Sequence, residues 1–276
     1  MPDVWSMVSN LDTATQERLA DVLETRGADA QQQRMRDALL TDIGFPARAR
    51  VLDVGCGTGV LTRRLARWPN VDSVVGVDLA PSLLGRARTL CAALPNVAFE
   101  EGDATALPFP DASFEVVVLD STLSHVPDAE SAVAEAARVL RPDGTLAVFD
   151  GNYSTTTVAL GEHDPLQTCV DAMVTGSVTD GWLMRRLPRI VRDQGLDITR
   201  YAGHGYVETS GAEYLLTVID RGADMLQATG RIGPELAGAL KAEARRRVEG
   251  GSFFGQIVYT SLVARRPVAD RQPEGC

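Results

Sequence analysis

The residues best suited to chemistry form a glycine-rich turn that reads VLDVGCGTG over residues 51–59. Glycines let the chain turn sharply and let a ligand approach the backbone closely. We expect a helix over residues 58–67, and the free N–H groups at its start would suit a carboxylate. The same turn could also be a plain strand–helix connection, so the prediction of a ligand site needs support from other residues.

Two carboxylates supply that support. Asp78 follows a Val-rich run, and Asp103 lies in the sequence EGDA over residues 101–104. At the carboxyl ends of neighbouring parallel strands, Asp78 would accept hydrogen bonds from ribose hydroxyls and Asp103 from an adenine amino group. Each aspartate alone is also explained as a helix cap. Together with the glycine turn, they indicate a nucleoside site.

The elements that would position these residues alternate between strand and helix. Strands are predicted over 50–54, 73–78, 97–102, 114–119 and 145–150, with helices over 58–67, 81–93 and 128–140 between them. This alternation is typical of an α/β fold with a parallel sheet covered on both faces. Two later strands, over 196–208 and 253–264, would complete a doubly wound, seven-stranded sheet whose last strand is antiparallel.

Helices account for most of the remaining chain. Two are predicted before the sheet, over 11–26 and 29–43, with Gly27 between them. Others are expected over 164–174, 187–194, 211–229 and 234–248, and Pro188 would lie in the first turn of the second of these. We therefore expect a helical lid over residues 1–46 and a ligand-binding core over 47–150. Residues 151–268 would complete the sheet, with insertions 151–182 and 209–250 enclosing a second substrate, and 269–276 would be a disordered tail.

Four motifs in this order resemble those of class I S-adenosylmethionine (SAM)-dependent methyltransferases. They are the turn at 53–59, VD at 77–78, GDA at 102–104 followed by LPF at 107–109, and ARVLRPDG at 137–144. The similarity is greatest to the group that includes the ubiquinone and menaquinone biosynthesis methyltransferases, and it is close over residues 48–150. It implies a Rossmann-like fold, SAM as cofactor, S-adenosylhomocysteine as product and a small-molecule methyl acceptor.

The resemblance also implies roles for residues of the glycine turn and the lead-in helix. Gly55 and Gly57 would flank the methionine part of SAM, and Asp53 would organise their loop. Arg34 or Gln33, on the second N-terminal helix, would close over the cofactor.

Further roles fall on the ends of the next three strands. Asp78, with Leu79 beside it, would bind ribose, and Asp103 with Ala104 would bind adenine. Ser121, just past the fourth strand, would line the side of methyl transfer.

Two other classes of protein would share part of this pattern. A nicotinamide-dependent oxidoreductase would carry GxGxxG, whereas this turn has Val60 where the third glycine should stand. A SAM-binding protein without catalysis, acting as a regulator or scaffold, would keep the same motifs.

The catalytic candidates are histidines, because a general base is needed only where the acceptor must lose a proton. His125 lies in the loop after the fourth strand, nearest the expected transfer site, although it could equally be a packing residue. His163 could be a base oriented by Asp164, or Asp164 could simply cap a helix that begins at Pro165. His204 is expected farther from the site. With no base at all, positioning of the acceptor alone would carry catalysis.

The composition of the chain limits the kinds of ligand and partner that it is expected to bind. The 276 residues carry a net charge of −10, which disfavours nucleic acid, and no apolar run is long enough to span a membrane. The four cysteines are scattered, so neither a disulfide framework nor a metal site is expected, and the cytoplasm is the predicted location. Apolar residues of the insertions favour a hydrophobic or aromatic acceptor, although they could be ordinary helix core: Leu166, Met173, Leu215, Leu216 and Met225. The atom methylated and the oligomeric state are left open.

Overall fold

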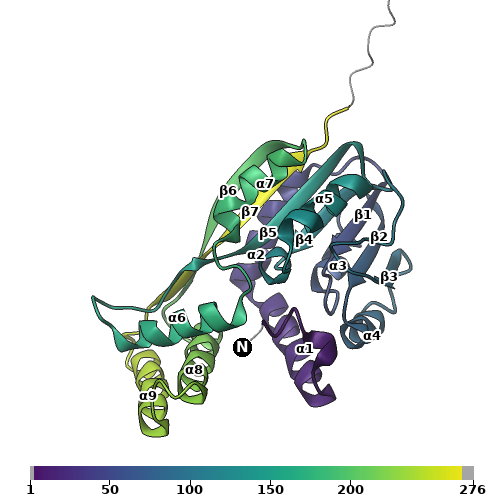
Figure 1. Ribbon diagram of the computed structural model, residues 1–276. Coiled ribbons are helices and arrows are strands. Elements are labelled where there is room, and N and C mark those ends of the chain that lie inside the picture. Colours follow the sequence, from purple (N-terminus) through teal and green to yellow (C-terminus); the bar gives the residue numbers. More distant parts are fainter. Residues whose placement is uncertain (1–2, 269–276) are drawn as a thin grey trace, which may run out of the picture.

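The computed structural model describes residues 3–268 and has a single seven-stranded sheet with helices on both faces (Figure 1). The strand order is β3-β2-β1-β4-β5-β7-β6. Strands β1 to β5 pair in parallel, whereas β7 runs antiparallel to both β5 and β6. The strands are β1 Ala49–Val54, β2 Val71–Asp78, β3 Val97–Glu101, β4 Phe114–Asp120, β5 Leu140–Thr157, β6 Asp197–Glu208 and β7 Gly255–Arg265. The predicted fold class is confirmed. The predicted tail over residues 269–276 lies outside the described residues.

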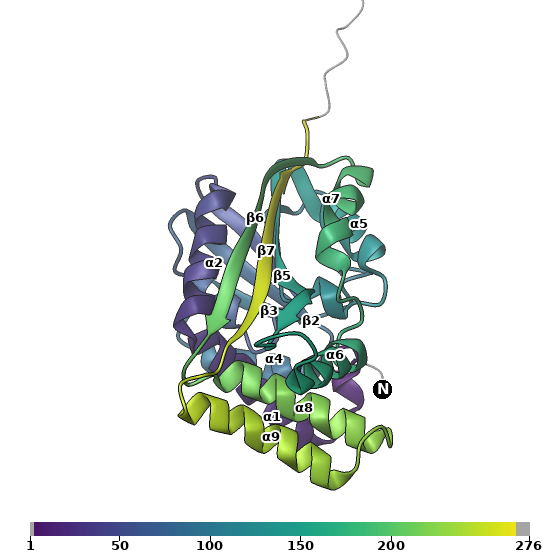
Figure 2. The same cartoon turned by 90° about the vertical axis from the view of Figure 1, so that its left-hand side faces the viewer.

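The two faces of the sheet follow from the alternation of side chains along each strand. Val51 of β1 and Val116 of β4 point toward helices α2 (Ala30–Ile43) and α3 (Val60–Leu65). Their neighbours Leu52 and Val117 point toward α5 (Ala129–Val139) and α7 (Leu183–Asp193). Figure 2 shows α2 on one side of the sheet and α5 and α7 on the other. Because both faces are covered, the central strands are apolar almost throughout.

The N-terminal helices meet at a different residue from the one predicted. Asp29, not Gly27, separates α1 (Thr13–Ala28) from α2, and its side chain accepts from the backbone N–H of Gln32 as an N-cap. Gly27 lies inside α1, where a Cβ would come within 2.5 Å of a Val60 methyl carbon. The glycine therefore lets α1 approach α3 closely and does not break the helix.

Helix α7 begins four residues earlier than predicted, so Pro188 lies inside it. Proline has no N–H to donate to the carbonyl of Met184, one turn back. The hydroxyl of Tyr201 on β6 donates to that carbonyl instead. The sequence pattern predicts a later start because proline is usually found in the first turn of a helix. It cannot show that the Tyr201 hydroxyl, from a distant strand, replaces the hydrogen bond that Pro188 cannot make to the Met184 carbonyl.

The late helices pack together at one end of the sheet, below β6 and β7 in both views (Figures 1 and 2). Helices α6 (Pro165–Ser177), α8 (Glu213–Ala228) and α9 (Pro234–Glu249) share a hydrophobic cluster. A Cβ on Gly222 of α8 would lie 1.8 Å from the Cys169 carbonyl oxygen of α6, so these helices touch backbone to backbone. Leu166, Met173 and Leu215 are buried in this cluster, which supports the reading of these residues as helix core.

The shorter elements complete the chain. Helix α4 (Pro81–Leu90) follows β2, and two 3₁₀ turns cover Val8–Asn10 (η1) and Leu123–His125 (η2). No helix among residues 3–268 has both the length and the apolar character that a membrane crossing requires.

Candidate active site

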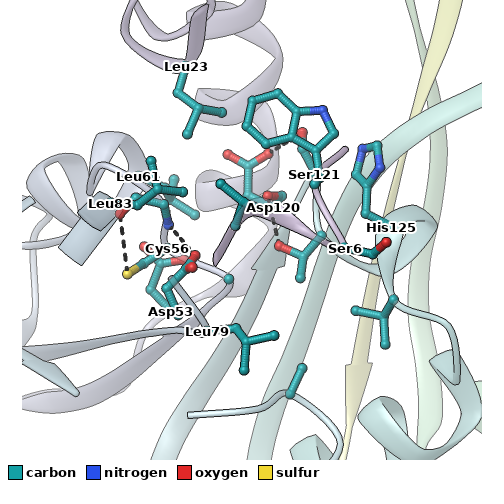
Figure 3. Close-up of a pocket in the computed structure, with 18 of the residues that line it drawn as sticks. Ser6, Leu23, Asp53, Cys56, Leu61, Leu79, Leu83, Asp120, Ser121 and His125 are labelled. Atoms are coloured by element: carbon teal, nitrogen blue, oxygen red, sulfur yellow. Dashed lines mark hydrogen bonds between the residues drawn. The ribbon is translucent and has the colours of Figure 1, made fainter. Parts of the chain in front are cut away.

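A cavity of about 450 Å³ opens where strands β1 to β4 end. Its walls come from the N-terminal segment, from α1 and α2, and from the loops that follow the four strands. Leu23 of α1 stands over one side of it, and Asp120 and Ser121 lie between Asp53 and His125 (Figure 3). The cavity as lined by the described residues includes nothing from 151–182 or 209–250. Enclosure of an acceptor by those two segments stays a prediction.

The glycine turn follows β1 as the sequence predicts. Gly55, Gly57 and Gly59 have φ angles of 71°, 53° and 78°, a region that side chains with a Cβ rarely adopt. A Cβ on Gly55 would come within 2.4 Å of the Thr122 side chain, and one on Gly57 would lie 2.8 Å from Leu23. The turn therefore needs glycine for conformation and for space, and it leaves bare backbone facing the cavity. Helix α3 has only six residues, so its end contributes less to anion binding than the predicted ten-residue helix would.

Asp53 lies beneath this turn and is 1% exposed. The Thr62 hydroxyl donates to Asp53 Oδ2 at 2.6 Å. Burial raises the pKa of Asp53 to about 7, while the Thr62 hydrogen bond opposes the rise. The carboxyl group that lines the cavity is therefore poised to change its charge near neutral pH.

Asp78 ends β2 and lines the same cavity, as predicted. Its Oδ2 accepts from the Gly57 N–H at 2.8 Å, and its Oδ1 accepts from the Ala80 N–H at 2.9 Å. Burial raises the pKa of Asp78, and these two backbone donors oppose the rise. Asp78 therefore ties the glycine turn to β2. Each carboxylate oxygen can accept more than one hydrogen bond, so a ligand can still be bound.

The other residues predicted to bind the cofactor, with one exception, also line the cavity. Asp103 and Ala104 follow β3, and the Asp103 carboxylate holds the Thr105 N–H and hydroxyl, each at 2.8 Å. Leu79 is half exposed beside Asp78. Ser121 follows β4 with a φ of 56°, and its hydroxyl donates to Asp120 at 3.0 Å.

The exception is the predicted contact from the second N-terminal helix: Arg34 is exposed on α2, and neither Arg34 nor its alternative Gln33 lines the cavity. Two residues further along the helix, Arg36 is 7% exposed and faces the cavity. Its Nε donates to Asp120 Oδ2 at 2.5 Å, and Arg36 Nη2 lies 3.4 Å from Asp120 Oδ1. The helical phase gave a usable signal, because Arg36 falls in step with the buried Gln32 and Leu39. An arginine in a buried stripe needs a charged or polar partner.

His125 is the histidine that the structure brings to the cavity. Its Nδ1 lies 2.6 Å from Asp3 Oδ2, and the N–H and hydroxyl of Thr179 also donate to that oxygen at 3.0 Å. Burial alone would raise the pKa of Asp3, but the hydrogen bond and charge of His125 lower it. On the other side of the ring, Nε2 lies 3.5 Å from the Tyr153 hydroxyl. A histidine oriented by a buried carboxylate is an arrangement suited to proton transfer.

The loop that carries His125 is anchored from β5. Asp150 is fully buried and accepts from both the N–H and the hydroxyl of Ser124, at 3.0 and 2.8 Å. Burial raises the pKa of Asp150, while the charge of His125 opposes the rise. These bonds set the position of η2 and hence of the imidazole.

The other two histidines lie outside the cavity lining. His163 is exposed in the turn before α6, and Asp164 caps that helix by accepting from the Leu166 N–H at 3.1 Å. Asp164 also pairs with Arg247, so its carboxylate is not directed to His163. His204 Nε2 lies 2.8 Å from the Ser261 hydroxyl on β7. The cap interpretation of Asp164 fits the structure.

The sequence did not point to Asp120 of β4 or Arg26 of α1, which line the cavity, or to Asp3, which binds His125. Asp120 stands at the end of β4, so its position at a strand end was a usable signal. Asp3 lies 122 residues from His125 in sequence, and no pattern near the start of the chain points to it.

Comparison with known proteins agrees with this geometry. Residues 52–148 match a family model described as a methyltransferase domain. The demethylmenaquinone methyltransferase of Tropheryma whipplei (strain Twist) is 37% identical over 47% of this chain and 53% of its own. The 27-O-demethylrifamycin SV methyltransferase of Amycolatopsis mediterranei (strain S699) is 41% identical over 42% of this chain and 44% of its own. The chain spans about half the length of the curated relatives that it matches.

Solved structures show the same fold. A candidate methyltransferase of Bacillus halodurans C-125 aligns with a TM-score of 0.61 and 21% identity, over 84% of this chain and 98% of its own. Residues 52–148 are thus a methyltransferase domain, which is the family that the motifs within this range predicted.

Proposed function

We propose that the whole chain is a SAM-dependent methyltransferase that acts on a small molecule. The observation that carries this proposal is that the glycine turn, Asp78, Asp103 and His125 line one cavity. A regulator that only binds SAM would need the first three of these, but not a histidine aligned by a buried carboxylate.

The cavity suits SAM in size and in charge. Its volume of about 450 Å³ falls within the roughly 300–1,000 Å³ of small-molecule sites. Five aspartates line it, Asp53, Asp78, Asp103, Asp120 and Asp128, which suits a ligand with an ammonium and a sulfonium group. When bound, SAM supplies an activated methyl group and a neutral thioether as leaving group.

We assign the cofactor contacts to the residues at the strand ends. The bare backbone at Gly55 and Gly57 would face the methionine part, with Asp53 beneath it. Asp78 beside Leu79 would accept from the ribose, and Asp103 with Ala104 would hold the adenine.

The acceptor side lies toward His125 and Ser121. The chain's task there is to hold the acceptor in line with the methyl group and to exclude water, and positioning can lower the barrier by roughly 7–11 kcal/mol. Where the acceptor must lose a proton, His125 Nε2 would take it, while Asp3 holds Nδ1. A positioned base adds roughly 10²–10⁴-fold to the rate. Among the described residues that line the cavity, His125 is present and His163 is not.

A hydrophobic or aromatic body is favoured for the acceptor. Trp5, Val8, Leu23 and Val126 line the cavity and supply apolar surface. Two relatives are named for methylating demethylmenaquinone and 27-O-demethylrifamycin SV, and these names support a small-molecule acceptor.

Calorimetry tests the cofactor first. SAM and S-adenosylhomocysteine should bind saturably and NAD should not, and NAD binding without a response to SAM would reverse the assignment. Transfer of labelled methyl from SAM to a panel of phenols, carboxylates and amines then separates an enzyme from a SAM-binding regulator. Cofactor binding without transfer to any member would favour the regulator.

A further inference from the structure

Arg26 on α1 lines the cavity, yet no carboxylate among residues 3–268 pairs with it. Its Nη2 donates to the Tyr259 hydroxyl at 3.2 Å, and the guanidinium carbon lies 5.5 Å from the centre of the Tyr214 ring. Its Nε is buried and has no hydrogen-bond partner among the described residues. The guanidinium is therefore held by aromatic groups and keeps its full charge.

Two other arginines with little exposed surface, Arg36 and Arg247, form ion pairs with carboxylates. Arg36 is bound by Asp120, and Arg247 is bound by Asp164 and Glu243. A charge shielded from water without a counterion is unfavourable, and in proteins its counterion is usually a carboxylate. Arg26 has no such partner among the described residues and borders a cavity, so an anionic ligand bound in the cavity could act as its counterion.

A second free donor lies close to the first. Arg36 Nη1 is buried without a partner among the described residues, although the rest of that guanidinium holds Asp120. The Arg36 guanidinium lies 5.7 Å from the Phe149 ring centre, and Phe149 stacks on Tyr259 with ring centres 5.2 Å apart. Tyr259 is the hydrogen-bond partner of Arg26. The two arginines therefore approach one aromatic stack and both face the cavity.

The sheet order places Arg26 on the side away from the nucleoside residues. Its partner Tyr259 belongs to β7, which lies beyond β4 and β5 when counted from β1. Asp78 and Asp103 follow β2 and β3, on the opposite side of β1. His125, the proposed base, follows β4 and thus lies on the same side as Arg26. The unpaired charge belongs to the acceptor end of the cavity.

We propose that the methyl acceptor carries an anionic group, a carboxylate or a phosphate, which Arg26 binds with Arg36 Nη1 as a second donor. This inference rests on the proposed function. It describes an acceptor with an apolar body for Trp5 and Leu23 and a negatively charged end for Arg26. Guanidinium groups suit such ends because their planar donors match carboxylate and phosphate oxygens.

The test uses benzoate and benzamide, which have similar shapes and differ in charge. Calorimetry with the full chain saturated with S-adenosylhomocysteine should show benzoate binding at least tenfold more tightly than benzamide. Arg26→Gln should remove that preference and leave the affinity for S-adenosylhomocysteine unchanged. Arg18→Gln, which changes an exposed arginine of the same helix, is the matched control and should keep the preference.

Each other outcome is decisive. Equal affinity for the two probes, or no saturable binding of either, overturns the proposal, as does a preference that survives in Arg26→Gln. A parallel loss of affinity for S-adenosylhomocysteine in Arg26→Gln would mean that Arg26 binds the cofactor's own carboxylate, which also overturns it. If the wild-type protein does not bind S-adenosylhomocysteine, the proposed function fails, and the probe comparison without cofactor still judges Arg26.

Folding is checked by the same variants. Arg26→Gln removes a charge that no carboxylate among the described residues pairs, but it also loses the hydrogen bond to Tyr259, so its Tm should stay close to that of the wild type. If it does not fold, Arg26→Lys keeps the charge and loses the planar donors. That variant should bind benzoate severalfold more weakly while still preferring it to benzamide, and unchanged benzoate affinity would overturn the proposal.

Discussion

The buried carboxyl group of Asp53 should make the stability of the free protein depend on pH. Burial raises its pKa from 3.8 to about 7, with the Thr62 hydrogen bond opposing the rise. Between these two values the folded state holds a proton that the unfolded state has lost. The free energy of unfolding must therefore fall as pH rises across this window, and above about pH 7 the full penalty persists.

The magnitude follows from the pKa shift. One pKa unit corresponds to about 1.4 kcal/mol, so from about pH 5.5 to about pH 8.5 the Asp53 contribution should fall by roughly 2 kcal/mol. Asp53→Asn cannot ionise and should lack this contribution. Other carboxyl groups with raised pKa values, such as Asp78 and Asp150, are present in both proteins, so they cancel when the two pH dependences are subtracted.

Urea unfolding of both proteins at the two pH values measures the difference. The wild type should lose roughly 2 kcal/mol more than Asp53→Asn. The same ionisation should raise the affinity of the wild type for cationic SAM as pH rises. The SAM affinity of Asp53→Asn should change little over the same pH range. If the two proteins lose the same stability between these pH values, Asp53 does not titrate near neutrality and the reasoning is refuted.

The sequence predicts the sheet well because its strands are apolar runs separated by clear turn residues. The predicted strand over 145–150 is too short, because β5 continues past Asp150 to Thr157, where it pairs with β7. That extension depends on pairing with β7, about 100 residues further along the chain, and local composition does not show it. The start of α7 was missed for a similar reason, since a hydroxyl from β6 compensates for Pro188.

The cofactor side of the site could be predicted because its residues follow consecutive strands, and parallel strands end at one edge of a sheet. The acceptor side could not. His125 is aligned by Asp3 from the start of the chain, and Arg26 depends on Tyr259 near the end of it. Those contacts arise only when the N-terminal segment and α1 fold across the strand ends. Acceptor specificity is thus built from long-range contacts that leave no local motif.

Four further predictions rest on individual contacts. Asp78→Asn should weaken SAM binding by roughly 1.5–3 kcal/mol in calorimetry, since a charge-assisted bond is lost, and unchanged affinity would place ribose elsewhere. Tyr201→Phe should lower the free energy of unfolding by about 1 kcal/mol, because the Met184 carbonyl loses its donor. In a Pro188→Ala background, which restores an N–H, the same change should cost less, and equal costs would contradict this account. With an acceptor identified, His125→Ala should reduce turnover at saturating SAM by roughly 10²–10⁴-fold without altering SAM affinity. Asp3→Asn should reduce turnover in the same direction by a smaller factor, because the imidazole stays but its orienting carboxylate is lost. The pKa of Asp3 is lowered in the fold, so its stabilising contribution is present above the unfolded value of 3.8 and disappears as pH falls through the lower folded value. Asp3→Asn should therefore be less stable than the wild type at neutral pH and approach it in acid. A turnover that follows this stability loss at every pH, and matches the wild type once unfolded protein is subtracted, would reduce Asp3 to a structural residue.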